Sequence, residues 1–170
     1  MSATFKYFAY GSNLLAQRIH LNNPSAKRSG NGKLAAWRLD FGEYESKRWG
    51  GHPATIVPDE AATVWGAIWD VGMENMADLD RQEGVDKNVY RAVELSVVTS
   101  SGQIVKCRSY CLVNQPGAAK PDGTPSYLPS KVYLDTIVRG AKETGLPNDY
   151  VAKLEAIPHN GYDGPVNWLE

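Results

Sequence analysis

Alternating hydrophobic and polar positions predict that this chain is rich in β-strands. The alternation is typical of half-buried strands, and it covers residues 4–10, 34–41, 54–57, 63–71, 89–99 and 103–114. Ser100, Ser101 and Gly102 separate the last two segments and predict a hairpin between them. Prolines at positions 53 and 58 flank the segment 54–57, which reads as a short strand of its own.

Helical periodicity appears briefly at Leu15, Arg18 and Ile19, after the first strand, and in three later stretches. Residues 74–82 predict a short helix whose inner side carries Met73, Met76 and Leu79, and Gly84 lies just past its end. The strongest pattern covers residues 130–144, where Ser130 can cap the helix and Gly145 can end it, and residues 148–157 predict a last helix.

Strands in succession, with helices at both ends and one between, predict an α+β fold in a single domain over residues 1–170. The expected architecture is a small, mostly antiparallel β-barrel or curled mixed sheet with flanking helices. Residues 43–52 and 115–129 predict loops. The second is long enough to be either a lid over a site or a mobile connection.

Charge, hydropathy and cysteine spacing argue against nucleic-acid binding, a membrane span and a disulfide. Lys and Arg number 18 and Asp and Glu number 19, and this balance argues against a nucleic-acid surface. No apolar run has the length of a membrane span, and the first residues lack the layout of a secretory signal. The basic pairs Lys27-Arg28 and Lys47-Arg48 read as solvated loop residues. Cys107 and Cys111, four residues apart on one strand, would lie about 13 Å apart, beyond disulfide reach. Reduced thiols favour the cytoplasm.

The junction between the first strand and the following helical pattern, Tyr10-Gly11-Ser12-Asn13-Leu14, is a candidate site. Glycine permits unusual backbone angles there, and Ser12 or Asn13 can cap the helix. Such a turn directs unpaired N–H groups at one point, which suits a carboxylate, a phosphate or a developing oxyanion. The alternative is an ordinary connection between two elements.

Glu83 is a second candidate, because it falls in the last turn of the predicted helix 74–82. The helix dipole is negative at this end, and apolar neighbours would add desolvation, so both effects raise the pKa of the carboxyl group. A glutamate with such a pKa can accept and donate protons near neutral pH. The alternative is an exposed glutamate at a helix end.

Tyrosines and histidines complete the candidate chemistry. Several tyrosines lie on predicted strands or the strong helix, where they either converge on a polar pocket or simply pack in the core; these are Tyr7, Tyr10, Tyr90, Tyr110 and Tyr133. The three histidines lack metal-ligand spacing and read as packing or surface residues. Ser12 could act as a nucleophile only with a base in reach, and no recognisable base is supplied.

Short motifs in order along nearly the whole chain resemble the γ-glutamylcyclotransferases of the AIG2-like superfamily. They lie at residues 7–15, 18–21, 23–26, 39–42, 54–56, 64–66, 79–85, 107–110 and 140–147. The chain departs from the family pattern at residues 48–53, which include an additional proline, and at residues 115–129, which are longer. Both departures bear on the pocket rim and the preferred leaving group.

The resemblance implies a barrel enzyme, a carbon–nitrogen lyase of glutathione metabolism, that releases 5-oxoproline and a free amino acid from γ-glutamyl amino acids. It assigns catalysis to Glu83 and substrate binding to Tyr7, Phe8, Ala9, Tyr10, Gly11, Ser12, Asn13, Tyr90, Tyr110 and Tyr133. It also implies a homodimer that needs no metal, and we expect no cofactor. The reduced thiols, the charge balance and the lack of a long apolar run add the expectation of a cytoplasmic protein without a nucleic-acid or membrane partner.

Three alternatives stay open at this point. The substrate could be a γ-glutamylamine, such as an ε-lysyl isopeptide, or glutathione. The chain could instead be a non-catalytic module that holds an anion or a γ-glutamyl group at the turn 10–13. Ser12 could also form a covalent adduct with the substrate.

Overall fold

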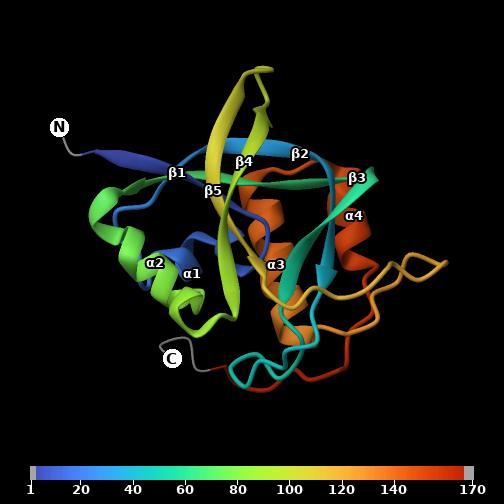
Figure 1. Cartoon of the computed structure of the whole chain (residues 1–170). Coiled ribbons are helices and arrows are strands. Elements are labelled where there is room, and N and C mark those ends of the chain that lie inside the picture. The colour runs from blue at the N-terminus through green and yellow to red at the C-terminus, as the bar shows by residue number, and fades with distance from the viewer. Residues whose placement is uncertain (1–2, 167–170) are drawn as a thin grey trace.

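The computed structural model describes residues 3–166, and its centre is a closed five-stranded barrel (Figure 1). The strands follow the order β1-β3-β2-β4-β5 around the barrel. Their bounds are β1 Thr4–Ala9, β2 Lys27–Phe41, β3 Ala54–Gly72, β4 Tyr90–Thr99 and β5 Ile104–Leu112. The predicted α+β barrel with flanking helices is confirmed, although the expected domain 1–170 extends at both ends outside the described residues.

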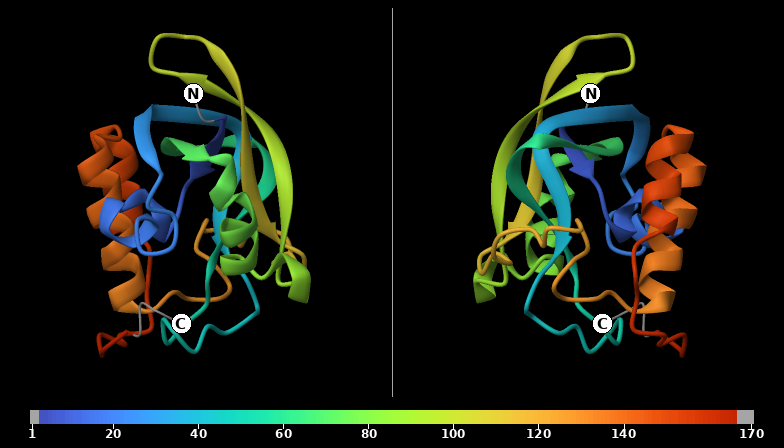
Figure 2. Two further views of the ribbon diagram at one scale, coloured as in Figure 1. Left: turned by 90° about the vertical axis from the view of Figure 1, so that its left-hand side faces the viewer. Right: turned by 90° about the vertical axis from the view of Figure 1, so that its right-hand side faces the viewer.

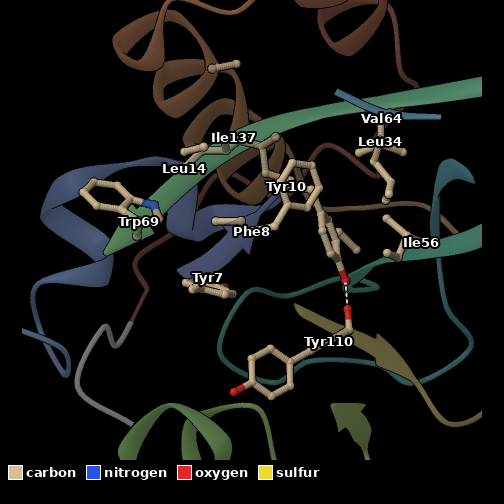
Figure 3. Close-up of a cluster of buried hydrophobic side chains, with 14 of the residues drawn as sticks. Tyr7, Phe8, Tyr10, Leu14, Leu34, Ile56, Val64, Trp69, Tyr110 and Ile137 are labelled. Atoms are coloured by element: carbon tan, nitrogen blue, oxygen red, sulfur yellow. Dashed lines mark hydrogen bonds between the residues drawn. The ribbon is translucent and has the colours of Figure 1, made fainter. Parts of the chain in front are cut away.

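The barrel closes between β1 and β5, the one parallel pair, where Tyr7 lies opposite Arg108. Side chains reinforce this closure. The Tyr10 hydroxyl donates a hydrogen bond to the Tyr110 carbonyl at 2.5 Å (Figure 3), and the Ser109 hydroxyl donates to the Phe8 carbonyl at 2.8 Å. The other neighbouring strands pair antiparallel.

The segments 54–57 and 63–71 are not two strands, as the sequence predicts, but parts of the single strand β3. In the pairing with β2, Pro58 lies opposite Trp37 and Thr63 lies opposite Ala35. The four residues 59–62 on β3 therefore face a single residue, Ala36, on β2. Ala36 adopts a φ of 66° at this irregularity. Proline has no N–H to donate to the neighbouring strand, and the irregular pairing beside Pro58 lets the strand continue past it.

The predicted hairpin is confirmed. β4 and β5 pair from Tyr90 opposite Leu112 to Val98 opposite Ile104. Gly102, in the turn, has a φ of 86°. The tip of this hairpin projects beyond the rest of the barrel in both orientations (Figures 1 and 2).

The helices lie on two sides of the barrel, with α3 and α4 packed together on one side and α2 on the other (Figure 2). The helix bounds are α1 Ala16–Ile19, α2 Met76–Gln82, α3 Lys131–Thr144 and α4 Asn148–Glu155, and single 3-10 turns cover η1 Ser12–Leu14, η2 Met73–Asn75 and η3 Val85–Lys87. As predicted, the Ser130 hydroxyl caps α3 by accepting from the Tyr133 N–H at 3.1 Å.

Two details of the helices differ from the prediction. Residues 73–75 form a 3-10 turn before α2, and Met73 is 44% exposed rather than on the inner side. The side chain that α2 buries is Leu79. Opposite this helix, α3 buries Ile137 beside Leu14, in the cluster of apolar side chains that fills the barrel end (Figure 3). None of the helices in residues 3–166 is long and apolar enough to cross a membrane.

Candidate active site

A pocket with about 360 Å³ of empty space, partly open to solvent, lies at the turn that follows β1. It is lined by Tyr7, Tyr10, Gly11, Ser12, Asn13, Ala54, Glu83, Tyr90, Ser109, Tyr110 and Tyr133. The turn, Glu83 and the five tyrosines named from the sequence thus face one cavity.

Phe8 and Ala9 are the two sequence candidates that do not line the pocket. Side chains alternate along a strand, so Phe8 points to the opposite face of β1 from Tyr7 and is fully buried in the core. Ala9 is buried within the barrel wall, where it pairs with Ala67 of β3. Both residues support the pocket through the backbone of β1.

The turn after β1 is closed by a hydrogen bond from the Leu14 N–H to the Gly11 carbonyl at 3.0 Å. The predicted side-chain cap by Ser12 or Asn13 is wrong, because the Asn13 amide instead donates to the Tyr7 hydroxyl at 3.1 Å. The N–H groups of Ser12 and Asn13 accordingly have no acceptor within residues 3–166. They are donors that a bound anion can use.

Gly11 does not supply a left-handed conformation, since its φ is −115°. A Cβ at this position would lie 3.6 Å from the Tyr133 hydroxyl oxygen and 3.7 Å from the Ala54 Cβ, both ordinary contacts. The glycine keeps the space between these two pocket residues free. Its role is therefore to leave room in the cavity rather than to bend the chain.

Two carbonyls of this turn accept hydrogen bonds from side chains that do not line the pocket. The Trp69 indole N–H donates to the Asn13 carbonyl at 3.0 Å, and the Arg28 guanidinium donates to the Leu14 carbonyl at 2.8 Å. Arg28 is half-buried on β2 and is not the solvated loop residue that the sequence predicts. Gly140 of α3 approaches so closely that a Cβ there would lie 2.6 Å from the Leu15 nitrogen. These contacts fix the orientation of the turn before any ligand binds.

Glu83 lies directly after α2, and its N–H closes the last turn of this helix on the Leu79 carbonyl at 3.0 Å. Gly84 follows with a φ of 67° and stops the helix. Burial is the main cause that raises the pKa of Glu83 from its ordinary value of 4.5 to about 7. The prediction that apolar surroundings shift this carboxyl group toward neutral pH is confirmed in direction.

Two arginines beside the pocket were not predicted. Arg18 is only 2% exposed, its guanidinium lies 5.7 Å from the centre of the Trp49 ring, and burial lowers its pKa to about 10. Arg48, expected to be solvated, is half-buried. Both positive charges lower the pKa of Glu83 and so oppose part of the burial effect. The overlooked signal is a cation between Leu15 and Ile19 on the apolar face of α1.

The pocket tyrosines are held by hydrogen bonds within the protein. The Tyr90 hydroxyl donates to the Ala54 carbonyl at 2.7 Å, and the Tyr133 hydroxyl accepts from the Ala54 N–H at 3.0 Å. Burial raises the pKa of all five above the ordinary value of 10.0. Near neutral pH they are therefore uncharged groups, and the acceptor role of Tyr133 toward Ala54 leaves its proton available for a ligand.

The histidines and cysteines behave as the sequence predicts. His20 lies with Nε2 at 2.8 Å from the Ala26 carbonyl, and His52 lies with Nδ1 at 2.9 Å from the Gly42 carbonyl. Cys107 and Cys111 are free, buried thiols. In the described part of the chain, no group of three or more His, Cys, Asp or Glu side chains is arranged to hold a metal ion.

Comparison with known proteins assigns the family. A sequence profile of the AIG2-like family matches residues 63–154. Gamma-glutamylcyclotransferase of Mus musculus is 44% identical over 96% of this chain and 84% of that protein, and the one of Homo sapiens is 42% identical over the same shares. The chain belongs to the γ-glutamylcyclotransferases of the AIG2-like family.

Solved structures agree with this family assignment. A structure named gamma-glutamyl cyclotransferase superposes with a TM-score of 0.89 at 42% identity, over 97% of this chain and 94% of that one. A yeast gamma-glutamyl cyclotransferase specific to glutathione superposes with a TM-score of 0.60 at 12% identity, over 91% and 94% of the two chains. At that identity, the yeast structure shows a shared fold alone.

Proposed function

We propose that this protein cyclises γ-glutamyl amino acids to 5-oxoproline and releases the free amino acid. One observation carries the proposal: Glu83, with a pKa of about 7, lines the same small pocket as the turn 11–13. The N–H groups of Ser12 and Asn13 in this turn have no acceptor within residues 3–166 and can donate to a substrate. The high coverage and identity of the curated γ-glutamylcyclotransferases support this reaction class.

The reaction needs little besides a folded substrate and one proton carrier. The substrate's α-amine attacks its own γ-carbonyl carbon, a carbon–nitrogen bond forms to close a five-membered ring, and the bond to the leaving nitrogen breaks. Holding these atoms in attack geometry can contribute roughly 7–11 kcal/mol. Glu83 takes the proton from the α-ammonium group and later gives it to the departing nitrogen.

The turn and the tyrosines would hold the γ-glutamyl part. The N–H groups of Ser12 and Asn13 would bind the α-carboxylate or the tetrahedral oxyanion, with a typical loss of roughly 3–4 kcal/mol for each missing oxyanion donor. Tyr133 would donate its hydroxyl proton to the substrate. As the family resemblance implies, we expect this chemistry without a metal or cofactor, so activity should persist in a chelator.

Activity should fall as the pH drops below about 7, because the reaction needs Glu83 as a carboxylate. The kcat/KM for γ-glutamyl-alanine, measured across pH, should show an acidic limb with its midpoint near that value. A rate that stays level down to about pH 5, close to an ordinary glutamate pKa, would contradict the role of a buried base.

The substrate class can be tested with three compounds in one assay. We expect 5-oxoproline from γ-glutamyl-alanine and much slower release from γ-glutamyl-ε-lysine and glutathione. A preference for γ-glutamyl-ε-lysine would make the protein a γ-glutamylamine cyclotransferase. Binding of all three compounds without product would instead indicate a non-catalytic γ-glutamyl-binding module, and a covalent adduct on Ser12, detected by mass spectrometry, would indicate a nucleophilic route.

We further propose that the protein is a homodimer that contributes to glutathione metabolism, as the family resemblance implies, and that it is cytoplasmic, as its free thiols favour. Sedimentation velocity of the purified protein tests the first part of this proposal. A single species at the monomer mass of 18.7 kDa would refute it.

A further inference from the structure

An ion pair outside the pocket connects α2 to β5. The Arg108 guanidinium donates to both carboxylate oxygens of Asp80, at 2.9 and 2.8 Å from Nη2 and at 3.1 Å from Nε. The Tyr110 hydroxyl donates to the same carboxylate and accepts from Arg108 Nε at 3.0 Å. Asp80 thus has an arginine and a pocket tyrosine as partners.

This contact is placed where it controls Glu83. Asp80 and Glu83 are three residues apart, so they lie near each other on the same side of α2. Leu79 is the one residue that α2 buries, so side-chain contacts have a large part in holding this helix. Two of them lie in its second half: the Asp80 ion pair and a hydrogen bond from the Asn23 amide to the Gln82 side-chain carbonyl at 3.1 Å. Of these two contacts, the Asp80 ion pair is the one that ties the helix end, and with it Glu83, to β5.

The other end of the contact reaches the substrate turn. Arg108 is the β5 residue that lies opposite Tyr7 where the barrel closes. Two residues later, the Tyr110 carbonyl accepts from the Tyr10 hydroxyl. Asp80 is therefore linked, through Arg108 and Tyr110, to the strand that leads into the turn 10–13.

We propose that Asp80 is a positioning residue for the cyclisation, holding α2 on β5 so that the Glu83 carboxylate faces the substrate turn. The proposal rests on the function given above. An exposed ion pair commonly contributes little, but Asp80 and Arg108 are only 29% and 28% exposed and share a bidentate contact with a third partner.

Asp80 also adds a negative charge near the base. The charged groups that act on Glu83 are Arg18 from α1, Arg48 from the loop after β2, and Asp80 from its own helix. The buried tyrosines around it are uncharged. Asp80 raises the pKa of Glu83 while the two arginines lower it. Loss of the Asp80 charge should consequently shift the acidic limb of the rate toward lower pH.

Asp80→Asn is the decisive variant, because it keeps the shape of the side chain and removes its charge. We expect kcat for γ-glutamyl-alanine to fall by roughly 10- to 100-fold with a smaller change in KM, as for a misplaced catalytic group. The acidic limb should move to lower pH. Asp78→Asn is the matched control, since Asp78 lies on the same helix and pairs with the exposed Arg81 at 3.0 Å. Its kcat should stay within about twofold of the wild type.

A second variant covers the case in which Asp80→Asn does not fold. Arg108→Lys keeps the positive charge but loses the bidentate contact. It should lower kcat while leaving the acidic limb in place, because the Asp80 charge remains. Wild-type kcat in every folded variant of this pair would overturn the positioning role. Wild-type protein that makes no 5-oxoproline would instead refute the proposed function, and the positioning role with it.

Discussion

Glu83→Gln should abolish 5-oxoproline release and leave the fold intact. Glutamine has nearly the same shape as glutamate but cannot carry a proton from the α-ammonium group to the leaving nitrogen. Loss of a general acid–base group typically costs roughly 10²- to 10⁴-fold in rate. Because one group would serve both transfers here, we expect kcat to fall by at least roughly 10⁴-fold, the upper end of that range. The measurement is 5-oxoproline formed from γ-glutamyl-alanine by wild type and variant side by side.

The stability of the same variant provides an independent control. The pKa of Glu83 is about 7 in the folded protein against an ordinary value of 4.5, so between these values the folded state binds more protons than the unfolded state. The free energy of unfolding of the wild type therefore falls as the pH rises through this range.

Glutamine has no such titration, so Glu83→Gln should be more stable than the wild type near pH 8 by about 1–2 kcal/mol, with the gain vanishing below about pH 4.5. This gain is smaller than the free energy that corresponds to the whole pKa shift, because the Glu83 side chain is only half-buried and solvent screens part of the effect. Thermal unfolding at several pH values measures it. An inactive variant that is also less stable near pH 8 would indicate a damaged fold, and near wild-type turnover would refute the catalytic role.

Gly140→Ala should destabilise the protein, although alanine normally favours a helix by about 1 kcal/mol over glycine. A Cβ at this position of α3 would lie 2.6 Å from both the Leu14 Cβ and the Leu15 nitrogen. Because one of these atoms is backbone, the turn or the helix has to move. Overpacking of this kind typically costs about 1–3 kcal/mol, which we expect as a lower melting temperature.

The same displacement should impair activity, since Leu14 directly follows the N–H donors of the substrate turn. We expect a loss in kcat/KM of roughly 100-fold for a shift of about 1 Å in the turn. Gly117→Ala is the control, because nothing lies within 4 Å of a Cβ at that loop position. Equal stability and activity in the two alanine variants would show that α3 does not fix the turn.

Local patterns account for the parts of this structure that the sequence predicts. The hairpin β4–β5, the capped helix α3 and the helix end at Glu83 each depend on residues close together in the chain. The convergence of Tyr10 and Tyr110 involves residues 100 positions apart and came from the family resemblance. No pattern of neighbouring residues in the sequence shows that these two tyrosines meet.

Three features escaped the sequence for physical reasons. Proline normally interrupts a strand, but β3 continues through Pro58 because its pairing with β2 is irregular there. The sequence around Pro58 does not contain this information, since the pairing depends on residues of β2. Arg18 belongs to the helical pattern after the first strand, but that pattern does not show that a charged side chain is buried there. Phe8 and Ala9 belong to the family motif, yet strand alternation directs Phe8 away from the pocket and pairing with Ala67 buries Ala9 in the barrel wall.

The sparse pairing around β4 and β5 has a consequence for motion. β5 meets β1 at a single pair, and β4 meets β2 only at Gly32 opposite Thr99 and Lys33 opposite Val98. Amide hydrogens along these edges should exchange with solvent sooner than those of the long ladder between β2 and β3. The wall that carries Tyr110 would then loosen by sub-global opening while the opposite wall stays closed, which offers a route for product to leave.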